Sequence, residues 1–285
     1  MHTERPAIGL GFRMLLFVPG NRMDRVEKAH ATAADVVCID LEDAVPPADK
    51  AGARDGVLAY LADGATPRTA VRINGLRTAA GLRDLLALAE AARPPAILLV
   101  PMVESAAELA IVDAILGDRA VSVVPLVETV EGLAAVREIG ASPRVDNVMF
   151  GGGDLSTQLG VDLAWEPLLQ ARSQFVLGCV AARVRAVDVP FVNVKDEAGL
   201  AAEAARAKAL GFAAKAVIHP AQVEPVARAF QPTADELTRA RAAVEAYRQA
   251  GGRAVMHDGM MLDEPIVRRL ESLLQQDNVQ QDNEA

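Results

Sequence analysis

The sequence contains only two cysteines among its 285 residues, Cys38 and Cys179. Two cysteines cannot build a disulfide framework or a four-cysteine zinc site, so a reducing, cytoplasmic location is expected. Aromatic residues make up only 4% of the chain, and the formal net charge is -9, which argues against a general nucleic-acid-binding protein. No window approaches the ~18 apolar residues that a membrane span needs, and the first residues lack a secretory signal pattern, so no membrane association is expected.

Hydrophobic residues nevertheless make up 51% of the chain and charged residues 24%, which is enough apolar side chain for a large core. This composition excludes intrinsic disorder over most of the chain. The length fits one large domain or two small ones. The acidic balance does not exclude an anionic substrate, because arginines placed in a site can override the net charge locally.

Short apolar runs alternate with segments rich in Ala, Leu, Glu and Arg, which is the rhythm of repeated βα units. Strands are predicted at Met14–Val18, Asp35–Ile39, Ala70–Ile73, Ala96–Val100, Val121–Val127, Asn147–Phe150, Pro190–Val194 and Ala214–Ile218. Helices are predicted at Arg22–Ala33, Lys50–Leu61, Thr78–Ala91, Ser105–Leu116, Thr129–Ile139, Leu168–Val187 and Glu197–Leu210. Eight units favour a (β/α)8 TIM barrel of the α/β class, with a doubly wound open sheet as the alternative.

The chain continues beyond what a barrel requires. We assign residues 1–230 to the barrel, 231–276 to a C-terminal helical extension, and 277–285 to a polar, disordered tail. The extension is predicted to hold two helices and a glycine-rich link between them: Thr233–Ala250, Pro265–Gln275 and Gly251–Gly259. An arm that packs on a neighbouring subunit would explain these extra helices.

Two carboxylates follow neighbouring strands of the predicted barrel. Glu128 and Asp154 are 26 residues apart, which is one βα unit, so both belong at adjacent strand ends. Active sites of (β/α)8 barrels lie at this end of the strands. Two carboxylates completed by water and substrate oxygens form a typical Mg²⁺ site. The alternative is that each acid caps the helix that follows it.

An arginine and three acids belong to the same rim. A guanidinium at Arg72 can bind a carboxylate through two hydrogen bonds or stabilise an enolate oxygen. The alternative is a salt bridge from Arg72 to Glu42 or Asp43, and both roles are compatible. Asp40, like Glu42 and Asp43, follows the predicted strand Asp35–Ile39. Three acids so close together are costly unless arginine or a metal offsets their charge. His219 is interpreted as a structural hydrogen-bonding residue.

Several long motifs resemble a known family when they are taken in order. They are LLFVPGNRMDRVEKA, ADVVCIDLEDAVPPADKAGAR, AVRINGL, VPLVETVEGLAAVREIGASPRV, FGGGDLSTQLG, ALGFAAKAVIHPAQVEPVARAFQPT and GMMLDEPIVRR. They resemble the citrate lyase β-subunit-like branch of the HpcH/HpaI aldolase superfamily, which includes malyl-CoA and citramalyl-CoA lyases. The resemblance runs from about Met14 to Leu270.

The resemblance implies a Mg²⁺-dependent (β/α)8 barrel that makes or breaks a carbon–carbon bond next to a thioester or a keto acid. By position, Glu128 and Asp154 resemble the two metal ligands of the family. Arg72 resembles its arginine that holds the substrate carboxylate or the enolate oxygen. Glu42 and Asp43 match the acidic rim that organises substrate binding.

The resemblance also assigns residues outside this rim. Arg22 and Lys28 resemble positions that contact coenzyme A in malyl-CoA lyases. Asp263 resembles the catalytic acid of the C-terminal arm. In the family this arm can reach over a neighbouring subunit, which implies a homotrimer or a hexamer.

The implied activity is cleavage of a 3-hydroxyacyl-CoA, of the malyl-CoA or citramalyl-CoA type, to an acyl-CoA and a small 2-oxo acid. Mg²⁺ lowers the pKa of the substrate hydroxyl, Arg72 offsets the enolate charge, and Asp263 protonates carbon. The alternatives are a citrate lyase β subunit acting on a carrier-bound citryl thioester and a catalytically weak thioester-binding protein. A thioesterase variant is a further one, because water could attack the same thioester.

The chain also departs from the family pattern. Pyruvate aldolases carry a histidine base at the position of Asp43, which places this chain with the thioester lyases. The family lysine after strand four reads Met102, and the residue before the metal aspartate reads Gly153. A glycine before strand seven reads Val189, and a later acid reads Asn193. These positions lie near the rim, so they bear on substrate preference.

Overall fold

The computed structural model describes residues 11–284 of the chain. The chain folds into two compact units that divide between Phe230 and Gln231. Among the described residues, none of the helices combines the length and the apolar character that crossing a lipid bilayer requires.

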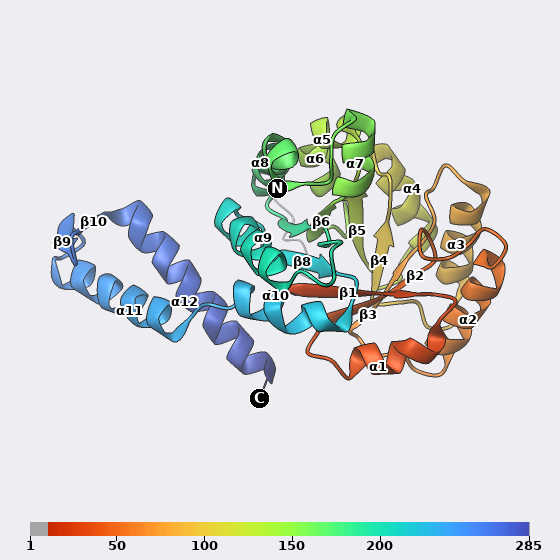
Figure 1. Cartoon of the computed structure of the whole chain (residues 1–285), viewed down its shortest axis with the longest axis horizontal. Coiled ribbons are helices and arrows are strands. Elements are labelled where there is room, and N and C mark those ends of the chain that lie inside the picture. Colours follow the sequence, from red (N-terminus) through yellow and green to blue (C-terminus); the bar gives the residue numbers. More distant parts are fainter. Residues whose placement is uncertain (1–10, 285) are drawn as a thin grey trace. The chain divides into compact units, whose positions relative to one another are not determined.

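Eight parallel strands of the first unit close into a barrel in sequence order (Figure 1). The closure is made by β1 and β8, where Met14 lies opposite Lys215 and Leu16 opposite Val217. This confirms the (β/α)8 prediction and excludes the open sheet. The strands are β1 (Met14–Pro19), β2 (Val36–Asp40), β3 (Thr69–Arg72), β4 (Ile97–Val100), β5 (Ser122–Val127), β6 (Asn147–Phe150), β7 (Arg185–Asp188) and β8 (Ala214–Val217).

Helices lie around the outside of this barrel (Figure 1). They are α1 (Val26–His30), α2 (Lys50–Ala62), α3 (Ala79–Glu90), α4 (Ala106–Leu116), α5 (Val130–Ala134), α6 (Val136–Gly140), α7 (Gly152–Leu159), α8 (Trp165–Ala182), α9 (Glu197–Leu210) and α10 (Val223–Phe230). Local signals set several ends: Ser105 and Glu108 form a capping box at α4, and Gly211 ends α9 with a φ of +112°.

The strands are apolar throughout because both of their faces are buried. One face fills the barrel interior, with side chains drawn alternately from all eight strands, such as Leu15, Cys38 and Met149. The other face packs against the helices, as Leu16 and Ile39 do. This double burial explains why the strands read as continuous apolar runs.

The seventh strand was predicted in the wrong place. Strand β7 is Arg185–Asp188, whereas the predicted Pro190–Val194 is a loop in which Val192 is 60% exposed. The predicted helix also ran too far, because α8 ends at Ala182, where Arg183 takes a left-handed φ of +61°. Strand β7 begins and ends with a charged residue, so a search for apolar runs does not find it. The buried carboxylate of Asp188 is neutralised by ion pairs with residues of other elements.

Two predicted helices are broken rather than continuous. The segment Arg22–Ala33 begins with a 3-10 turn at Met23–Arg25 before α1. The segment Thr129–Ile139 forms α5 and α6, which meet at Ala135.

The second unit contains α11 (Ala234–Gln249), the strands β9 (Val255–His257) and β10 (Met260–Leu262), and α12 (Glu264–Glu284). Its core is a cluster of Ala243, Val244, Leu262 and Val267. The predicted glycine-rich link contains a hairpin, because β9 and β10 pair antiparallel across the turn at 258–259. Helix α12 extends through residues 277–284 of the predicted tail, and residue 285 lies outside the described residues. The predicted disorder of this tail stays a prediction.

A buried ion network joins β7 and β8 to the surrounding helices. Lys215 Nζ lies 2.6 Å from Asp188 Oδ2 and 2.8 Å from Glu203 Oε1, and it also donates to the carbonyl oxygen of Val189 at 2.6 Å. Arg172 Nε reaches the other oxygen of Asp188 at 3.2 Å. Two cations and two carboxylates therefore offset one another, and of the four side chains only that of Glu203 is partly exposed.

We expect Lys215→Met to lower the free energy of unfolding by about 3–5 kcal/mol, because it removes one of the two cations that neutralise the buried carboxylate of Asp188. The control Lys195→Met, at an exposed position, should change it by less than about 0.5 kcal/mol. Urea unfolding followed by circular dichroism measures both. Equal effects of the two substitutions would contradict the structural role of the network.

Candidate active site

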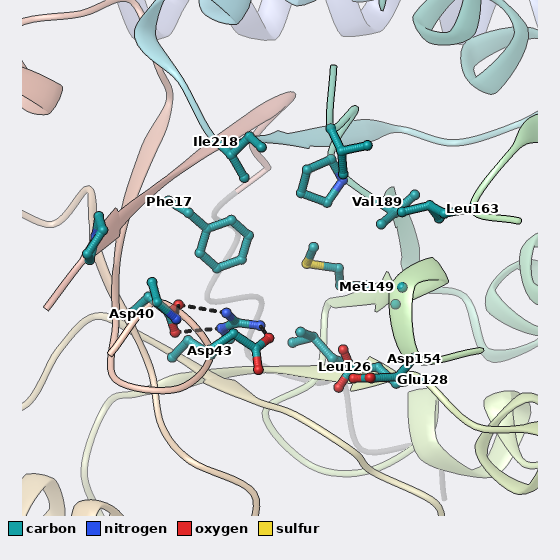
Figure 2. A pocket seen from close by; sticks show the side chains of 17 residues that line it. Phe17, Asp40, Asp43, Leu126, Glu128, Met149, Asp154, Leu163, Val189 and Ile218 are labelled. Atoms are coloured by element: carbon teal, nitrogen blue, oxygen red, sulfur yellow. Dashed lines mark hydrogen bonds and ion pairs between the residues drawn. The ribbon is translucent and has the colours of Figure 1, made fainter. Parts of the chain in front are cut away.

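A cavity of about 480 Å³ opens at the carboxyl ends of the barrel strands (Figure 2). Its floor is the top layer of the barrel interior, formed by Phe17, Leu126 and Met149. Its lining residues are Phe17, Pro19, Asp40, Asp43, Ala44, Arg72, Leu126, Glu128, Met149, Gly151, Gly153, Asp154, Leu163, Val189, Pro190, Val192 and Ile218. Of the residues predicted for the site, Arg72, Asp43, Glu128 and Asp154 thus meet in one cavity.

Arg72 is held by Asp40 through two parallel hydrogen bonds. Arg72 Nε donates to Asp40 Oδ1 and Nη2 donates to Oδ2, both at 2.7 Å. Both residues end neighbouring strands and lie opposite each other in the register of β2 and β3. Both side chains are buried, so this planar fork fixes the guanidinium in the cavity wall.

The remaining edge of the guanidinium faces the two acids predicted as its partners. Arg72 Nη1 lies 2.8 Å from Glu42 Oε2 and 3.3 Å from Asp43 Oδ2, which confirms the predicted salt bridges. The guanidinium also lies 4.9 Å from the ring centre of Phe17, a cation–π contact. Three acids and an aromatic face therefore set the position of Arg72.

Glu42 differs from the other acids because it is not among the described residues that line the cavity. Burial raises its pKa to about 9, and the negative charges of neighbouring acids add to this rise, while Arg72 opposes it. Its Oε2 atom lies near Arg72 but out of line for a hydrogen bond, so it has no hydrogen-bond partner in the described chain. Glu42 is thus a buried acid outside the cavity lining, and the positive charge near it does not compensate for its burial.

The loop that carries these acids is tied down by backbone contacts. Asp40 accepts the N–H groups of Glu42 at 2.9 Å and Ala44 at 3.0 Å. Lys50 Nζ donates to the carbonyl oxygens of Leu41 and Glu42, and it also contacts the side chain of Asn74. These anchors keep the loop after β2 beside Arg72.

Glu128 and Asp154 form the second acidic group of the cavity. Glu128 follows β5, and Asp154 lies in the first turn of α7, directly after β6. Burial raises the pKa of Glu128 to about 7, the N–H of Met102 and the charge of Arg72 lower it, and the charge of Asp154 raises it again. The two carboxylates therefore repel each other within the same cavity.

This donor set fits a hard divalent cation. Two carboxylates supply oxygen ligands, and a cation between them would offset their mutual repulsion, which raises the pKa of Glu128. No group of three or more His, Cys, Asp or Glu side chains in the described chain could hold a metal by itself. Such a cation would therefore have ligand positions left for water or for substrate oxygens.

The opposite wall of the cavity is apolar. Val189, Pro190 and Val192 follow β7, and Ile218 follows β8. Figure 2 shows Ile218 and Val189 facing the acids across Phe17 and Met149. The cavity is thus divided into an acidic half and an apolar half.

A second cavity, of about 460 Å³, shares three wall residues with the first: Phe17, Pro19 and Ile218. It is lined by four side chains that are or can become positively charged: Arg22, Arg25, Lys28 and His219. Arg22 is paired with Asp24, while His219 Nδ1 accepts the N–H of Ala221, as expected for a structural histidine. Both residues predicted to contact coenzyme A therefore line this second cavity.

Asp263 belongs to the second unit. It lies between β10 and α12, and its Oδ1 accepts the N–H of Ile266 at 3.2 Å, which caps the helix. Its catalytic role stays a prediction.

Two contacts in the site were not predicted from the sequence. Asp40 was one acid among three, and nothing local distinguished it as the partner of Arg72. The backbone N–H of Met102, which donates to Glu128 Oε2 at 2.8 Å, carries no residue-type signal.

The fold and the site together define a (β/α)8-barrel protein with an acidic, arginine-containing pocket at its carboxyl rim. The family model for HpcH/HpaI aldolase/citrate lyase matches residues 13–220, and the chain belongs to this family.

The relatives and solved structures most similar to this chain include lyase-named proteins that match over nearly their whole length. A citrate lyase subunit β-like protein of Mycobacterium tuberculosis is 37% identical, with 91% of this chain and 93% of the relative covered. An L-malyl-CoA/β-methylmalyl-CoA lyase of Cereibacter sphaeroides is 32% identical, with 93% and 94% covered. A (3S)-malyl-CoA thioesterase of the same organism is 35% identical, with 88% and 90% covered.

A solved structure has the same fold. It is that of CitE from Mycobacterium tuberculosis in complex with magnesium, acetoacetate and coenzyme A, with a TM-score of 0.82 and 34% identity. The match covers 93% of this chain and 97% of that chain.

We expect Asp40→Asn to lower the free energy of unfolding by about 3 kcal/mol, because it removes the charge that neutralises the buried Arg72. Asp43→Asn is the matched control, since its side chain is 73% exposed and its ion pair is longer, and it should cost less than about 1 kcal/mol. Urea unfolding of both variants in the same buffer measures the difference. Similar losses would show that Asp40 is not the main anchor.

A pH dependence follows from the two raised pKa values. The carboxyls of Glu128 and Glu42 have folded pKa values of about 7 and about 9, above their ordinary value of 4.5, so the folded state holds protons that the unfolded state releases. Stability in EDTA should therefore be largest near pH 5 and fall as the pH rises towards 9, by on the order of 1–3 kcal/mol. Urea midpoints at pH 5.5, 7 and 8.5 measure it.

Glu128→Gln is the control for this pH series. It removes one of the two titrations, so its stability should fall less steeply between pH 5.5 and 8.5 than that of the wild type. An equally steep fall would assign the pH dependence to other groups.

Proposed function

We propose that this protein is a magnesium-dependent carbon–carbon lyase. It cleaves a 3-hydroxyacyl-CoA, of the malyl-CoA or citramalyl-CoA type, to an acyl-CoA and a small 2-oxo acid. The observation that carries this proposal is the junction of two unlike cavities. Glu128 and Asp154 lie in the first, Arg22 and Lys28 line the second, and both cavities share the wall at Phe17.

This junction fits the two ends of a coenzyme A thioester. A hydroxy acid end, rich in oxygen, suits the acidic half of the first cavity through a divalent cation. The chain that leads from the thioester suits the apolar wall of Val189 and Ile218, and the phosphates suit the cationic side chains of the second cavity. Malyl-CoA lyase relatives and a CitE structure that holds coenzyme A support this reading.

Glu128 and Asp154 are the residues that would hold magnesium, as the magnesium in the CitE complex and their oxygen donors support. Bound magnesium supplies Lewis-acid chemistry, which lowers the pKa of a substrate hydroxyl. Arg72 places a fixed positive charge in the cavity wall, where it offsets negative charge on the thioester fragment. Asp40 accepts its Nε–H and one Nη2–H, and Glu42 and Asp43 lie beside its Nη1, so N–H groups on Nη1 and Nη2 are left that could donate to substrate.

Three further parts of the proposal come from the family resemblance. Glu42 and Asp43 organise the substrate-binding rim through Arg72. Asp263 is the acid that protonates carbon, from its own subunit or a neighbouring one. We propose a homotrimer or a hexamer in the cytoplasm, in which the C-terminal helical extension contributes this acid.

A thioesterase is the second candidate, because a (3S)-malyl-CoA thioesterase is 35% identical to this chain. In that reaction water attacks the thioester and free coenzyme A is released in place of a 2-oxo acid. The same cavities would hold the substrate, so the products distinguish the two reactions.

The test is a Mg²⁺-dependent assay on malyl-CoA and citramalyl-CoA that measures the 2-oxo acid and free coenzyme A separately. We expect glyoxylate or pyruvate to be released, and Glu128→Ala, Asp154→Ala and Asp263→Ala each to lower kcat by at least about 100-fold. Asp55→Ala, at an exposed position of α2, is the control and should keep the wild-type rate.

The product pattern decides among the alternatives. Free coenzyme A without a 2-oxo acid would assign the protein as a thioesterase. Neither product, together with Mg²⁺ binding, would overturn the lyase and favour a carrier-dependent citrate lyase β subunit or a thioester-binding protein.

A further inference from the structure

The backbone at Met102 takes a conformation that few side chains adopt. Met102 follows Pro101 directly after β4, and its φ is +56°. Only three other described non-glycine residues have a positive φ: Arg144, Arg183 and Asp258. Among these four, Met102 is the one whose backbone contacts a carboxylate of the cavity.

The contact is made by the backbone N–H of Met102, which donates to Glu128 Oε2 at 2.8 Å. The next N–H, that of Val103, donates to the carbonyl oxygen of Leu126 at 3.0 Å. Two N–H groups further on, those of Glu104 and Ser105, donate to the capping carboxylate of Glu108. The left-handed residue is thus fixed by the contacts that follow it.

Gly151 holds Glu128 from another side. A Cβ at Gly151 would lie 2.0 Å from Glu128 Cγ and 2.6 Å from its Oε1, so any other residue here would displace the Glu128 side chain. Gly151 is itself tied to β5, because its N–H donates to the carbonyl oxygen of Val127 at 2.8 Å. Glu128 therefore lies between a glycine backbone and the N–H of Met102.

We infer that Met102 is a positioning residue for the metal site: its left-handed backbone fixes Glu128 Oε2 and leaves Oε1 as the oxygen for the cation. No hydrogen bond from the described residues reaches Oε1, whereas Oε2 is engaged by the N–H. The inference rests on the proposed function, because it takes Glu128 as a magnesium ligand.

The role belongs to the backbone and not to the methionine side chain. Any residue with an N–H that tolerates a positive φ can supply the same hydrogen bond. This explains how the chain can depart from the family lysine at this position without losing the arrangement of Glu128. It also predicts that the effect of a substitution follows backbone preference and not side-chain size or charge.

The experiment measures the Mg²⁺ dissociation constant of the purified full-length protein by isothermal titration calorimetry. Met102→Gly and Met102→Asn tolerate a positive φ, and Met102→Leu keeps the size of the side chain, so all three should bind Mg²⁺ within about twofold of the wild type. Met102→Val, which is β-branched, resists a positive φ and should weaken binding at least about tenfold.

Three controls separate this role from general damage. Asp258→Val places the same β-branched residue at a positive φ in the second unit and should leave Mg²⁺ affinity unchanged. Gly151→Ala should weaken binding, while Gly52→Ala, where a Cβ meets nothing within 4 Å, should not. Circular dichroism shows that each variant is folded before titration.

Wild-type affinity in folded Met102→Val would overturn the inference, as would a loss of affinity in Met102→Leu. If Met102→Val unfolds, the other variants still test the inference. It requires that Gly151→Ala weakens Mg²⁺ binding and that Met102→Asn and Met102→Gly keep the wild-type affinity. Failure of the wild type itself to bind Mg²⁺ would overturn the metal site of the proposed function instead.

Discussion

The ion pair between Arg72 and Asp40 is the contact on which the carboxyl rim depends. Asp40 accepts two hydrogen bonds along one edge of the guanidinium and also accepts two backbone N–H groups of the loop that follows it. One carboxylate therefore fixes the cation and the acidic loop at once. Without it, the buried charge of Arg72 would have to be balanced by Glu42 and Asp43, of which the latter is largely exposed.

The rest of the site follows from an excess of negative charge in a buried place. Burial raises the pKa of Glu128 and of Glu42 above their ordinary values, and Arg72 only partly opposes this. A divalent cation is the group that would offset the excess. The barrel prepares for it by holding Glu128 with the Met102 N–H and the Gly151 backbone, so the ligand is ordered by neutral groups that do not compete for its charge.

Sequence patterns predicted much of this arrangement. The alternation of apolar runs and helical segments predicted the barrel, and the positions of Glu128, Asp154, Arg72 and Asp43 at or just after the ends of four strands brought them to one cavity. The seventh strand was missed because its charged ends are stabilised by Lys215 and Arg172, which come from other elements. A pattern of apolar residues along the chain contains no information on an ion pair between residues that are distant in sequence.

The sequence by itself determined the fold and the strand ends that carry the acids, because apolar periodicity and chain order are local properties. Only the tertiary structure decided which acid holds Arg72 and which backbone group holds Glu128. These partners are 32 and 26 residues apart, and the register of neighbouring strands brings them together. The physical reason is that register is set by packing and hydrogen bonding between strands, which no single segment contains.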